Sequence, residues 1–216
     1  MNISCYVITM EGESTRQVYM KSQLDGLGIP FDFWQGNRGS RLEPQRLVED
    51  EVVTESFFLD EQHGLSVKLA QAGCALSHQQ LWQHYAQGSS AADMPLLILE
   101  DDACLDPDFC TRLNRLLPEV PVGTDVLYLG YVAESKDGEV VGPGLRRACY
   151  PRATTGYLIW PHGTERLLSR LFPLSMPIDE DMAKLIWLSE LSACIADPEL
   201  IVASPDFQST IWFPEG

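Results

Sequence analysis

Short apolar runs alternate along this chain with longer segments of helical character. Residues 3–9 are apolar and rich in β-branched side chains, which predicts a first strand. A helix is predicted over 14–27, where Ser14 and Gln17 have the spacing of a capping box. Residues 31–34 favour a second strand. This strand–helix–strand opening indicates a βαβ unit and an α/β domain.

The clearest helical pattern lies in the middle of the chain. Residues 40–64 are polar and weakly periodic, and we expect an irregular covering segment with short helices there. From about Ala70 the pattern predicts an amphipathic helix that ends in the loop 87–90, because one of its faces collects apolar and aromatic side chains. The side chains on that face are Cys74, His78, Leu81, Trp82 and Tyr85.

Turn signals divide the second half of the chain. Lys136-Asp137-Gly138 has the composition of a hairpin turn. Acids at 179–181 open the last predicted helix, where the helix dipole favours them. We predict strands at 125–129 and 154–160, a helix opened by 106–108 that runs to about 117, and helices at 164–171 and 179–190. The length of 216 residues suits one domain, or one domain with an appendage.

The most informative pattern is an apolar run that leads directly into acids. Residues 96–99 are all aliphatic, and so short a run predicts a buried strand. Glu100, Asp101 and Asp102 follow at its carboxyl end, where open α/β sheets bind ligands. Adjacent carboxylates repel one another and resist burial unless a positive charge neutralises them, so the run is either a site for a divalent cation such as Mg²⁺ or Mn²⁺ or a solvated acidic turn. If strand alternation continues, Glu100 and Asp102 share one side and Asp101 faces the other.

Charge narrows the possible ligands. The formal net charge is −16 at pH 7, which argues against a general nucleic-acid-binding protein, because phosphate backbones require Lys and Arg. It argues equally against attachment to anionic lipid through a basic patch. Neutralisation of a phosphorylated ligand would therefore depend on a metal ion or on a few well-placed cations.

The sequence favours a cytoplasmic protein. No apolar run reaches the length of a transmembrane helix, and residues 1–8 lack the basic leader and long apolar region of a secretory signal. The six cysteines are scattered and form no CxxC pair, so we expect reduced thiols rather than zinc ligands or disulfides. The sequence indicates no oligomeric state.

Several motifs occur in the order found in glycosyltransferase family 25, the bacterial lipooligosaccharide galactosyltransferases and their collagen-modifying relatives. The segment 73–78, Gly-Cys-Ala-Leu-Ser-His, resembles the GCxLSH helix of the family, and 99–102, Leu-Glu-Asp-Asp, resembles its LEDD signature. The combination of these two motifs is specific. Weaker matches are 7–9 with Arg16, Gln35-Gly36, 125–130, 156–159, 177–179 and 209–211.

The resemblance implies a GT-A-like fold: one α/β domain over 1–216 with a mixed central sheet and helices on both faces. It also implies metal-dependent, inverting transfer of a sugar, most often galactose from UDP-galactose, onto a saccharide acceptor of lipooligosaccharide or another surface glycan. The implied partners are the nucleotide-sugar donor and the acceptor, without nucleic acid and with at most peripheral membrane contact.

The resemblance also assigns roles to residues. Asp102 is the implied ligand of Mn²⁺ or Mg²⁺, and Asp179 is the implied general base, with Glu180 and Asp181 as alternatives. Helix capping is the competing interpretation of these last three acids. The implied donor-binding residues are Thr9, Arg16, Gly36, Ser77, His78, Glu100 and Asp101.

Three residues of these motifs can each be interpreted in two ways. Arg16 is either a phosphate ligand or a surface arginine of a first helical turn. His78 is either a ligand contact or a satisfied core histidine, and Gly73 permits either a close backbone approach or tight helix packing.

Departures from the family pattern leave the donor open. The opening reads Thr-Met-Glu-Gly-Glu-Ser-Thr-Arg over 9–16, and the acid expected in the turn at Gln35-Gly36 is missing, with Asn37 and Arg38 nearby. One rival hypothesis is a non-catalytic member that binds a sugar nucleotide or a partner protein. Another is metal-dependent phosphoryl transfer or phosphate-ester hydrolysis, although the first strand ends without a nucleophilic aspartate.

Overall fold

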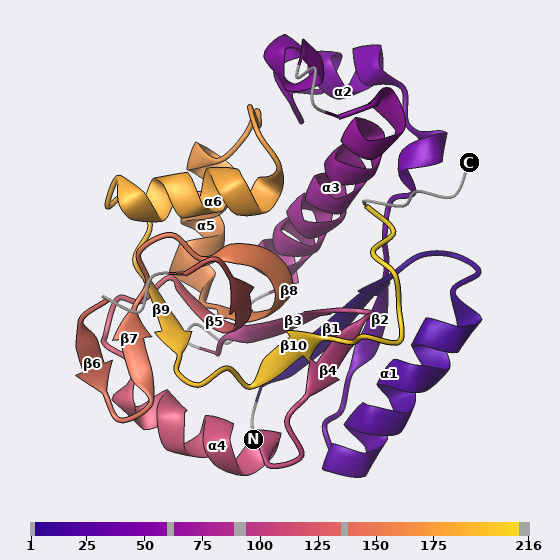
Figure 1. Ribbon diagram of the computed structural model, residues 1–216. Helices are drawn as coiled ribbons and strands as arrows, with labels where there is room; N and C mark the ends of the chain where they lie inside the picture. Colours follow the sequence, from indigo (N-terminus) through magenta and orange to yellow (C-terminus); the bar gives the residue numbers. More distant parts are fainter. Residues whose placement is uncertain (1–2, 60–62, 89–93, 135–137, 212–216) are drawn as a thin grey trace.

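A mixed sheet of eight strands forms the centre of the computed structural model, which describes residues 3–59, 63–88, 94–134 and 138–211 (Figure 1). Its strand order is β2-β1-β3-β8-β5-β9-β7-β6, and β10 and β4 form a separate antiparallel pair. The strands are β1 (Ser4–Thr9), β2 (Asp32–Gln35), β3 (Leu96–Glu100), β4 (Ala103–Leu105), β5 (Val126–Val132), β6 (Val140–Gly142), β7 (Leu145–Arg147), β8 (Arg152–Ile159), β9 (Ala193–Ala196) and β10 (Ile201–Ala203).

Helices cover both faces of this sheet. In Figure 1, α3, α5 and α6 lie on one side of it, and α1 and α4 lie on the other. The α-helices are α1 (Ser14–Leu27), α2 (Pro44–Glu49), α3 (Leu65–Gly88), α4 (Phe109–Leu116), α5 (Pro161–Arg170) and α6 (Ile178–Trp187). Short 3₁₀ turns are η1 (Gly39–Arg41), η2 (Glu55–Leu59) and η3 (Leu117–Glu119).

The aliphatic run before the acids is a central strand, as predicted. Residues 96–99 are all at most 1% exposed. Leu96 and Ile98 join the core under α3, α5 and α6, whereas Leu97 and Leu99 join the core over α1 and α4. A strand buried on both faces needs an uninterrupted apolar run rather than alternation. The predicted α/β fold with a mixed sheet and helices on both faces is therefore confirmed, and it is consistent with a GT-A-like fold.

Parallel pairing brings three strand ends to one edge of the sheet. β1 pairs in parallel with β2 and with β3, and α1 connects β1 to β2. The predicted βαβ opening is thus present. Ile8 lies opposite Glu100 in the register of β1 and β3, so Thr9 and the acids after β3 lie at neighbouring carboxyl ends.

The structure corrects several local predictions. Glu13 is the N-cap of α1 and makes no side-chain capping bond, so the capping box at Ser14 is wrong. The helix predicted from about Ala70 begins earlier, at Leu65. Strand β3 ends at Glu100, and the next two residues form a turn, so strand alternation does not extend to Asp102. The short strands β4, β6, β7, β9 and β10 were not predicted. The expected hairpin at 136–138 is wrong, because β5 pairs with β8 and β9 and not with β6, which forms its antiparallel pair with β7. Residues 136–137 lie outside the described residues.

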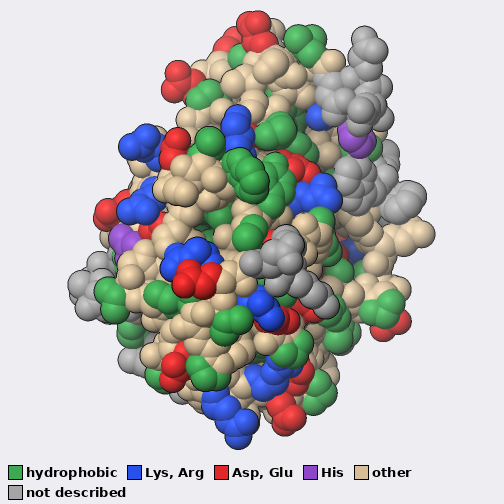
Figure 2. Space-filling model, turned by 60° about the vertical axis from the view of Figure 1, so that its left-hand side comes forward, with side chains coloured by type: hydrophobic (Ala, Val, Ile, Leu, Met, Phe, Trp, Pro, Cys, Tyr) green, Lys and Arg blue, Asp and Glu red, His purple; other side chains and the backbone are tan. Residues whose placement is uncertain are grey.

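Surface charge is mixed on the face shown in Figure 2, where basic side chains lie beside acidic ones rather than in one patch. Exposed ion pairs of the described residues include Arg147–Glu139 and Arg41–Glu11. The face therefore lacks the basic stripe that a nucleic-acid-binding surface requires. Within the described residues, no helix has both the length and the apolar character needed to cross a bilayer.

Candidate active site

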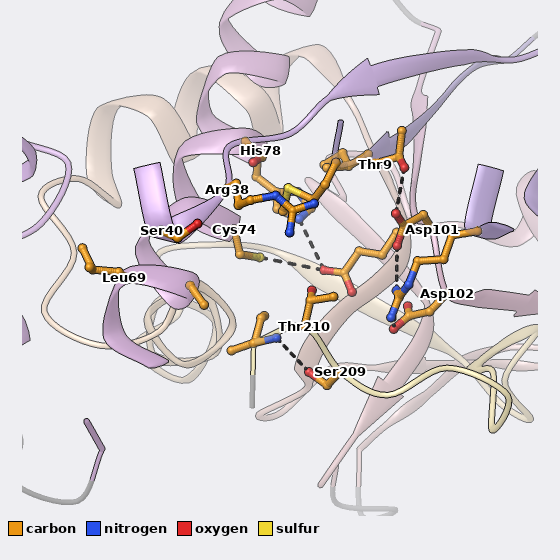
Figure 3. A pocket seen from close by; sticks show the side chains of 18 of the residues that line it. Thr9, Arg38, Ser40, Leu69, Cys74, His78, Asp101, Asp102, Ser209 and Thr210 are labelled. Atoms are coloured by element: carbon orange, nitrogen blue, oxygen red, sulfur yellow. Dashed lines mark hydrogen bonds and ion pairs between the residues drawn. The ribbon is translucent and has the colours of Figure 1, made fainter. Parts of the chain in front are cut away.

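A cavity of about 190 Å³ lies at the carboxyl ends of β1 and β3, beneath α3 (Figure 3). Its position is the one that open α/β sheets use for ligands. The cavity brings together seven of the nine predicted site residues, from four separate parts of the chain. These seven are Thr9, Arg16, Ser77, His78, Glu100, Asp101 and Asp102.

Asp101 is held by the protein on both of its oxygens. The Thr9 hydroxyl donates to Oδ2 at 2.8 Å, and Arg16 donates to Oδ1 at 2.8 Å. Burial raises the pKa of Asp101, and the bonds from Thr9 and Arg16 oppose this rise. Because both oxygens are engaged, Asp101 fixes the turn after β3.

Arg16 is buried, so its interpretation as a surface arginine is wrong. Besides Asp101, its guanidinium lies 3.6 Å from Asp102 Oδ2 and donates to the Gln208 carbonyl. It also stacks over the Phe207 ring at 5.0 Å. Arg16 therefore ties the acids to the C-terminal segment, whose residues 209–211 line the cavity. In the sequence, only the match of residues 209–211 to the family pattern pointed to this C-terminal segment as part of the site.

Asp102 is the least satisfied of the three acids. Its side chain is 18% exposed, and Oδ1 is buried with no hydrogen-bond partner. Burial, together with the neighbouring charge of Glu100, raises the pKa of Asp102 to about 7, because Arg16 offsets only part of the rise. A buried carboxylate oxygen without a hydrogen-bond partner fits a cation ligand, and carboxylate oxygens suit Mn²⁺ or Mg²⁺.

Glu100 is supported by neutral groups instead. Thr154 donates to Oε1 at 2.6 Å, and His78 Nε2 and the Cys74 thiol approach the same oxygen at 3.6 and 3.9 Å. Figure 3 shows Cys74 and His78 converging on one carboxylate oxygen. Burial raises the pKa of Glu100, but His78 and Thr154 outweigh it, so the pKa is lowered. Glu100 is thus held ionised beside Asp102.

Ser77 and two glycines join α3 to the loop after β2. Ser77 Oγ accepts from the Asn37 N–H at 2.8 Å and donates to the Gly73 carbonyl at 2.6 Å. A Cβ on Gly73 would lie 2.4 Å from the Asn37 carbonyl oxygen, so close backbone approach explains this glycine. Gly36 is absent from the residues that line the cavity and packs against Ser77 from the side. These residues shape the cavity wall.

Asp179 does not line the cavity. It lies in the first turn of α6 and accepts a hydrogen bond from the Ala153 N–H at 3.0 Å. Burial raises its pKa, and the charges of Glu180 and Glu100 add to the rise.

The other two acids of this helix have structural partners. Glu180 pairs with Arg152 at 2.7 Å, and Asp181 accepts from the Ser175 and Met176 N–H groups at 2.7 and 2.9 Å. These bonds are not helix capping, because Pro177 is the N-cap of α6 and no side-chain capping bond is made there, whereas Ser175 and Met176 precede the helix.

One group in the described residues has the composition of a soft metal site. The ligand atoms of Cys74, His78 and Glu100 lie within 4.8 Å of one another. This group differs from the predicted metal position at Asp102. All six cysteines are free thiols, as predicted.

Comparison with known proteins identifies the family. The sequence profile described as Glycosyltransferase family 25 (LPS biosynthesis protein) matches residues 2–137. The chain belongs to glycosyltransferase family 25. It is 30% identical over 182 residues to a glycosyltransferase 25 family member of Aedes aegypti, covering 81% of this chain and 29% of that protein.

Two further relatives widen the comparison. A procollagen galactosyltransferase 1-B of Xenopus laevis is 28% identical over 184 residues, covering 81% of this chain and 30% of that protein. The human protein named inactive glycosyltransferase 25 family member 3 is 32% identical over 130 residues, covering 57% of this chain and 21% of that protein. This family-25 chain thus spans less than a third of the length of these three relatives.

Proposed function

We propose that this member of family 25 is a metal-dependent, inverting glycosyltransferase that moves a sugar from a nucleotide diphosphate onto a saccharide hydroxyl. UDP-galactose is the first candidate donor, since one relative is named a procollagen galactosyltransferase. A surface glycan such as lipooligosaccharide is the first candidate acceptor, since the family description names LPS biosynthesis.

The observation that carries this proposal is Asp102, a residue of the cavity wall whose buried Oδ1 has no hydrogen-bond partner among the described residues. Asp102 would hold a divalent ion there, and Asp101, fixed by Thr9 and Arg16, would keep the turn in place. A bound divalent ion stabilises the negative charge that develops on a departing diphosphate.

Cations of the chain supply the remaining neutralisation. Arg16 is committed to Asp101 and to the C-terminal segment, so its role is to hold the acids rather than to bind phosphate directly. Arg38 also lines the cavity, and its side chain is 28% exposed. We therefore assign Arg38, a residue that departs from the family pattern, to the contact with the diphosphate.

Inverting transfer requires a base for the proton of the acceptor hydroxyl. Asp179 is the proposed base, because its raised pKa makes it a better proton acceptor than an ordinary aspartate. Asp179 stands in the first turn of α6, outside the residues that line the cavity.

The experiment is a screen of nucleotide sugars for release of the nucleoside diphosphate, with Mn²⁺ and with EDTA. We expect release from UDP-galactose that EDTA abolishes. Asp102→Asn should lower it by about 10³-fold, since a metal contributes several kcal/mol to charge stabilisation, while circular dichroism shows an unchanged fold.

Asp108→Asn is the matched control, because Asp108 is exposed and makes no side-chain capping bond. Its release rate should equal that of the wild type. Binding of the nucleotide sugar without turnover would contradict the proposal and would favour a non-catalytic role, as in the human relative named inactive. Hydrolysis of simple phosphate esters without a nucleotide sugar would instead favour the phosphoryl-transfer hypothesis.

A further inference from the structure

Three buried polar side chains form a hydrogen-bonded network next to Glu100, and the proposed reaction does not account for this network. Trp82 Nε1 lies 3.0 Å from the Tyr157 hydroxyl oxygen, and His78 Nδ1 lies 2.8 Å from the same oxygen. All three side chains are 0% exposed. His78 and Trp82 come from α3, and Tyr157 comes from β8. The contact therefore joins the helix to the centre of the sheet.

The hydrogen-bond donors in this network determine which ring nitrogen of His78 carries a proton. The indole N–H of Trp82 can only donate, so Tyr157 accepts from it. The Tyr157 proton then needs an acceptor, and His78 Nδ1 is the acceptor at 2.8 Å. If Nδ1 carried a proton instead, Tyr157 would accept from both neighbours and its own hydroxyl proton would be buried without a partner, which is costly. The Tyr157 hydroxyl proton therefore has an acceptor only when Nδ1 of His78 is unprotonated, which places the proton of the neutral ring on Nε2.

The Nε2–H group of His78 faces Glu100. It lies 3.6 Å from Oε1, the oxygen that Thr154 also binds at 2.6 Å. This separation exceeds a hydrogen bond, and among the described residues Nε2 has no hydrogen-bond partner, so its contact with Oε1 is electrostatic. We propose that Tyr157 is a positioning residue, which sets the tautomer of His78 and through it holds the carboxylate of Glu100 in one orientation in the cavity.

This inference rests on the proposed function and assigns Glu100 a task within it. Three protein groups converge on Oε1, so the carboxylate cannot rotate freely. The side chain of Glu100 is nevertheless 24% exposed and lines the cavity. A fixed, partly exposed carboxylate is a suitable acceptor for a ligand hydroxyl, either of the ribose or of the transferred sugar.

The same geometry argues against a soft metal held by Cys74, His78 and Glu100. Such a site needs the lone pair of His78 Nε2, and therefore a proton on Nδ1. That proton would leave the Tyr157 hydroxyl without an acceptor. The tautomer of His78 thus separates a positioning role from a metal-ligand role.

Nitrogen-15 NMR of histidine-labelled, metal-free protein tests the tautomer directly. The chain has four histidines, and the His78 signals are assigned by their loss in His78→Gln. We expect a protonated Nε2 and an unprotonated Nδ1 whose shift shows that it accepts a hydrogen bond. A proton on Nδ1 would overturn the proposal. This measurement uses the wild type, so it does not depend on any variant folding or on any activity.

Tyr157→Phe removes the hydroxyl, and Tyr128→Phe is the matched control. Tyr128 is equally buried, its ring centroid is 6.2 Å from that of Tyr157, and its hydroxyl has no partner. We expect the Nδ1 signal of His78 to move to the position of a nitrogen without a hydrogen bond in Tyr157→Phe only. An unchanged Nδ1 signal in that variant would contradict the proposed contact.

Calorimetric binding tests the effect on Glu100, with UDP and UDP-galactose as probes. We expect Tyr157→Phe to weaken binding of at least one probe by about tenfold, and to have no further effect in a Glu100→Gln background. 2′-Deoxy-UDP and deoxygalactose donors distinguish the ribose from the sugar, because only the analogue that lacks the bound hydroxyl should be insensitive to Tyr157→Phe.

If Tyr157→Phe weakens probe binding by the same factor in the wild-type and Glu100→Gln backgrounds, Tyr157 has only a structural role. This result would overturn the positioning role. If neither probe binds the wild type, the proposed function fails, and the NMR result still decides the tautomer. The two failures are therefore distinguishable.

Discussion

Of the three runs of three acids in the chain, at 49–51, 100–102 and 179–181, the fold uses the last two, here the first run (100–102) and the second run (179–181), in opposite ways. The first run ends a buried strand and faces a cavity. The second run opens a helix and makes most of its bonds to neighbouring protein groups. The same kind of sequence therefore serves ligand binding in one place and local structure in the other.

The difference lies in the partners. Asp181 accepts from two backbone N–H groups, and Glu180 has an arginine at 2.7 Å. Asp102 has an oxygen without any partner and a pKa raised by burial to about 7. An acid with local partners needs no ligand, whereas a buried acid that lacks one is stabilised by an added cation. The candidate ligand site is therefore indicated by an acid that lacks a hydrogen-bond partner, and not by a cluster of acids as such.

Asp179 is an exception to this contrast between the two acidic runs, because it belongs to the structural second run but is the proposed general base. Asp179→Asn should lower the rate of sugar transfer by about 10²-fold, since general bases contribute at least that factor. Binding of UDP-galactose should stay within twofold, roughly, because Asp179 does not line the cavity. Transfer rates and calorimetry measure the two effects.

If Asp179→Asn transfers sugar at the wild-type rate, Asp179 is not the general base and its role is purely structural. Glu180→Gln is its control. Glu180 bonds to Arg152 and Tyr150, so this variant should transfer sugar at the wild-type rate.

The structural role of the second run is tested at Asp181. Asp181→Ala leaves two backbone N–H groups without their acceptor. We expect the free energy of unfolding to fall by about 2 kcal/mol, with metal-dependent release per folded molecule unchanged. Urea denaturation and the release assay measure these quantities. Loss of release in a folded Asp181→Ala protein would show that the two runs are not separate in function.

The ligand role of the first run predicts a pH dependence of metal binding. The pKa of Asp102 is raised to about 7, so below this pH a proton competes with the metal. The affinity for Mn²⁺ should therefore fall about tenfold from pH 8 to pH 6. Titration calorimetry at the two pH values measures it. Asp102→Asn should bind Mn²⁺ weakly at both pH values. If the wild-type protein binds Mn²⁺ equally well at pH 6 and pH 8, Asp102 is not the metal ligand.

The smallest expected effect is on stability without metal. The folded protein binds the Asp102 proton more tightly than the unfolded chain does, because burial raises the pKa from 3.8. Wild-type stability should therefore decline as the pH rises from about 4 to 7, and Asp102→Asn should remove this decline. We expect Asp102→Asn to be about 1 kcal/mol more stable than wild type at pH 8 in EDTA.

Urea unfolding at pH 5 and pH 8 measures the change. Asp108→Asn, at an exposed aspartate, should show the wild-type pH dependence. A less stable Asp102→Asn protein at pH 8 would show that Arg16 satisfies Asp102 better than its unpartnered oxygen suggests.

Local pattern was sufficient for the main elements of the fold. The aliphatic run at 96–99 could only be a buried strand, and the apolar face from Cys74 to Tyr85 could only be a helix, because side-chain periodicity follows backbone geometry. The short strands β4, β9 and β10 were among those missed. They have four residues or fewer, and their pairing depends on partners remote in sequence.

The sequence by itself determined the strand–helix order, the acidic tip after β3 and the motifs that place the chain in its family. Only the tertiary structure decided which acids are satisfied. It buried Arg16 against Asp101, left Asp102 with a free oxygen and set Tyr157 beside His78. The reason is physical: periodicity is a local property of the backbone, whereas burial and hydrogen-bond partners depend on residues brought together from 79 or more positions apart.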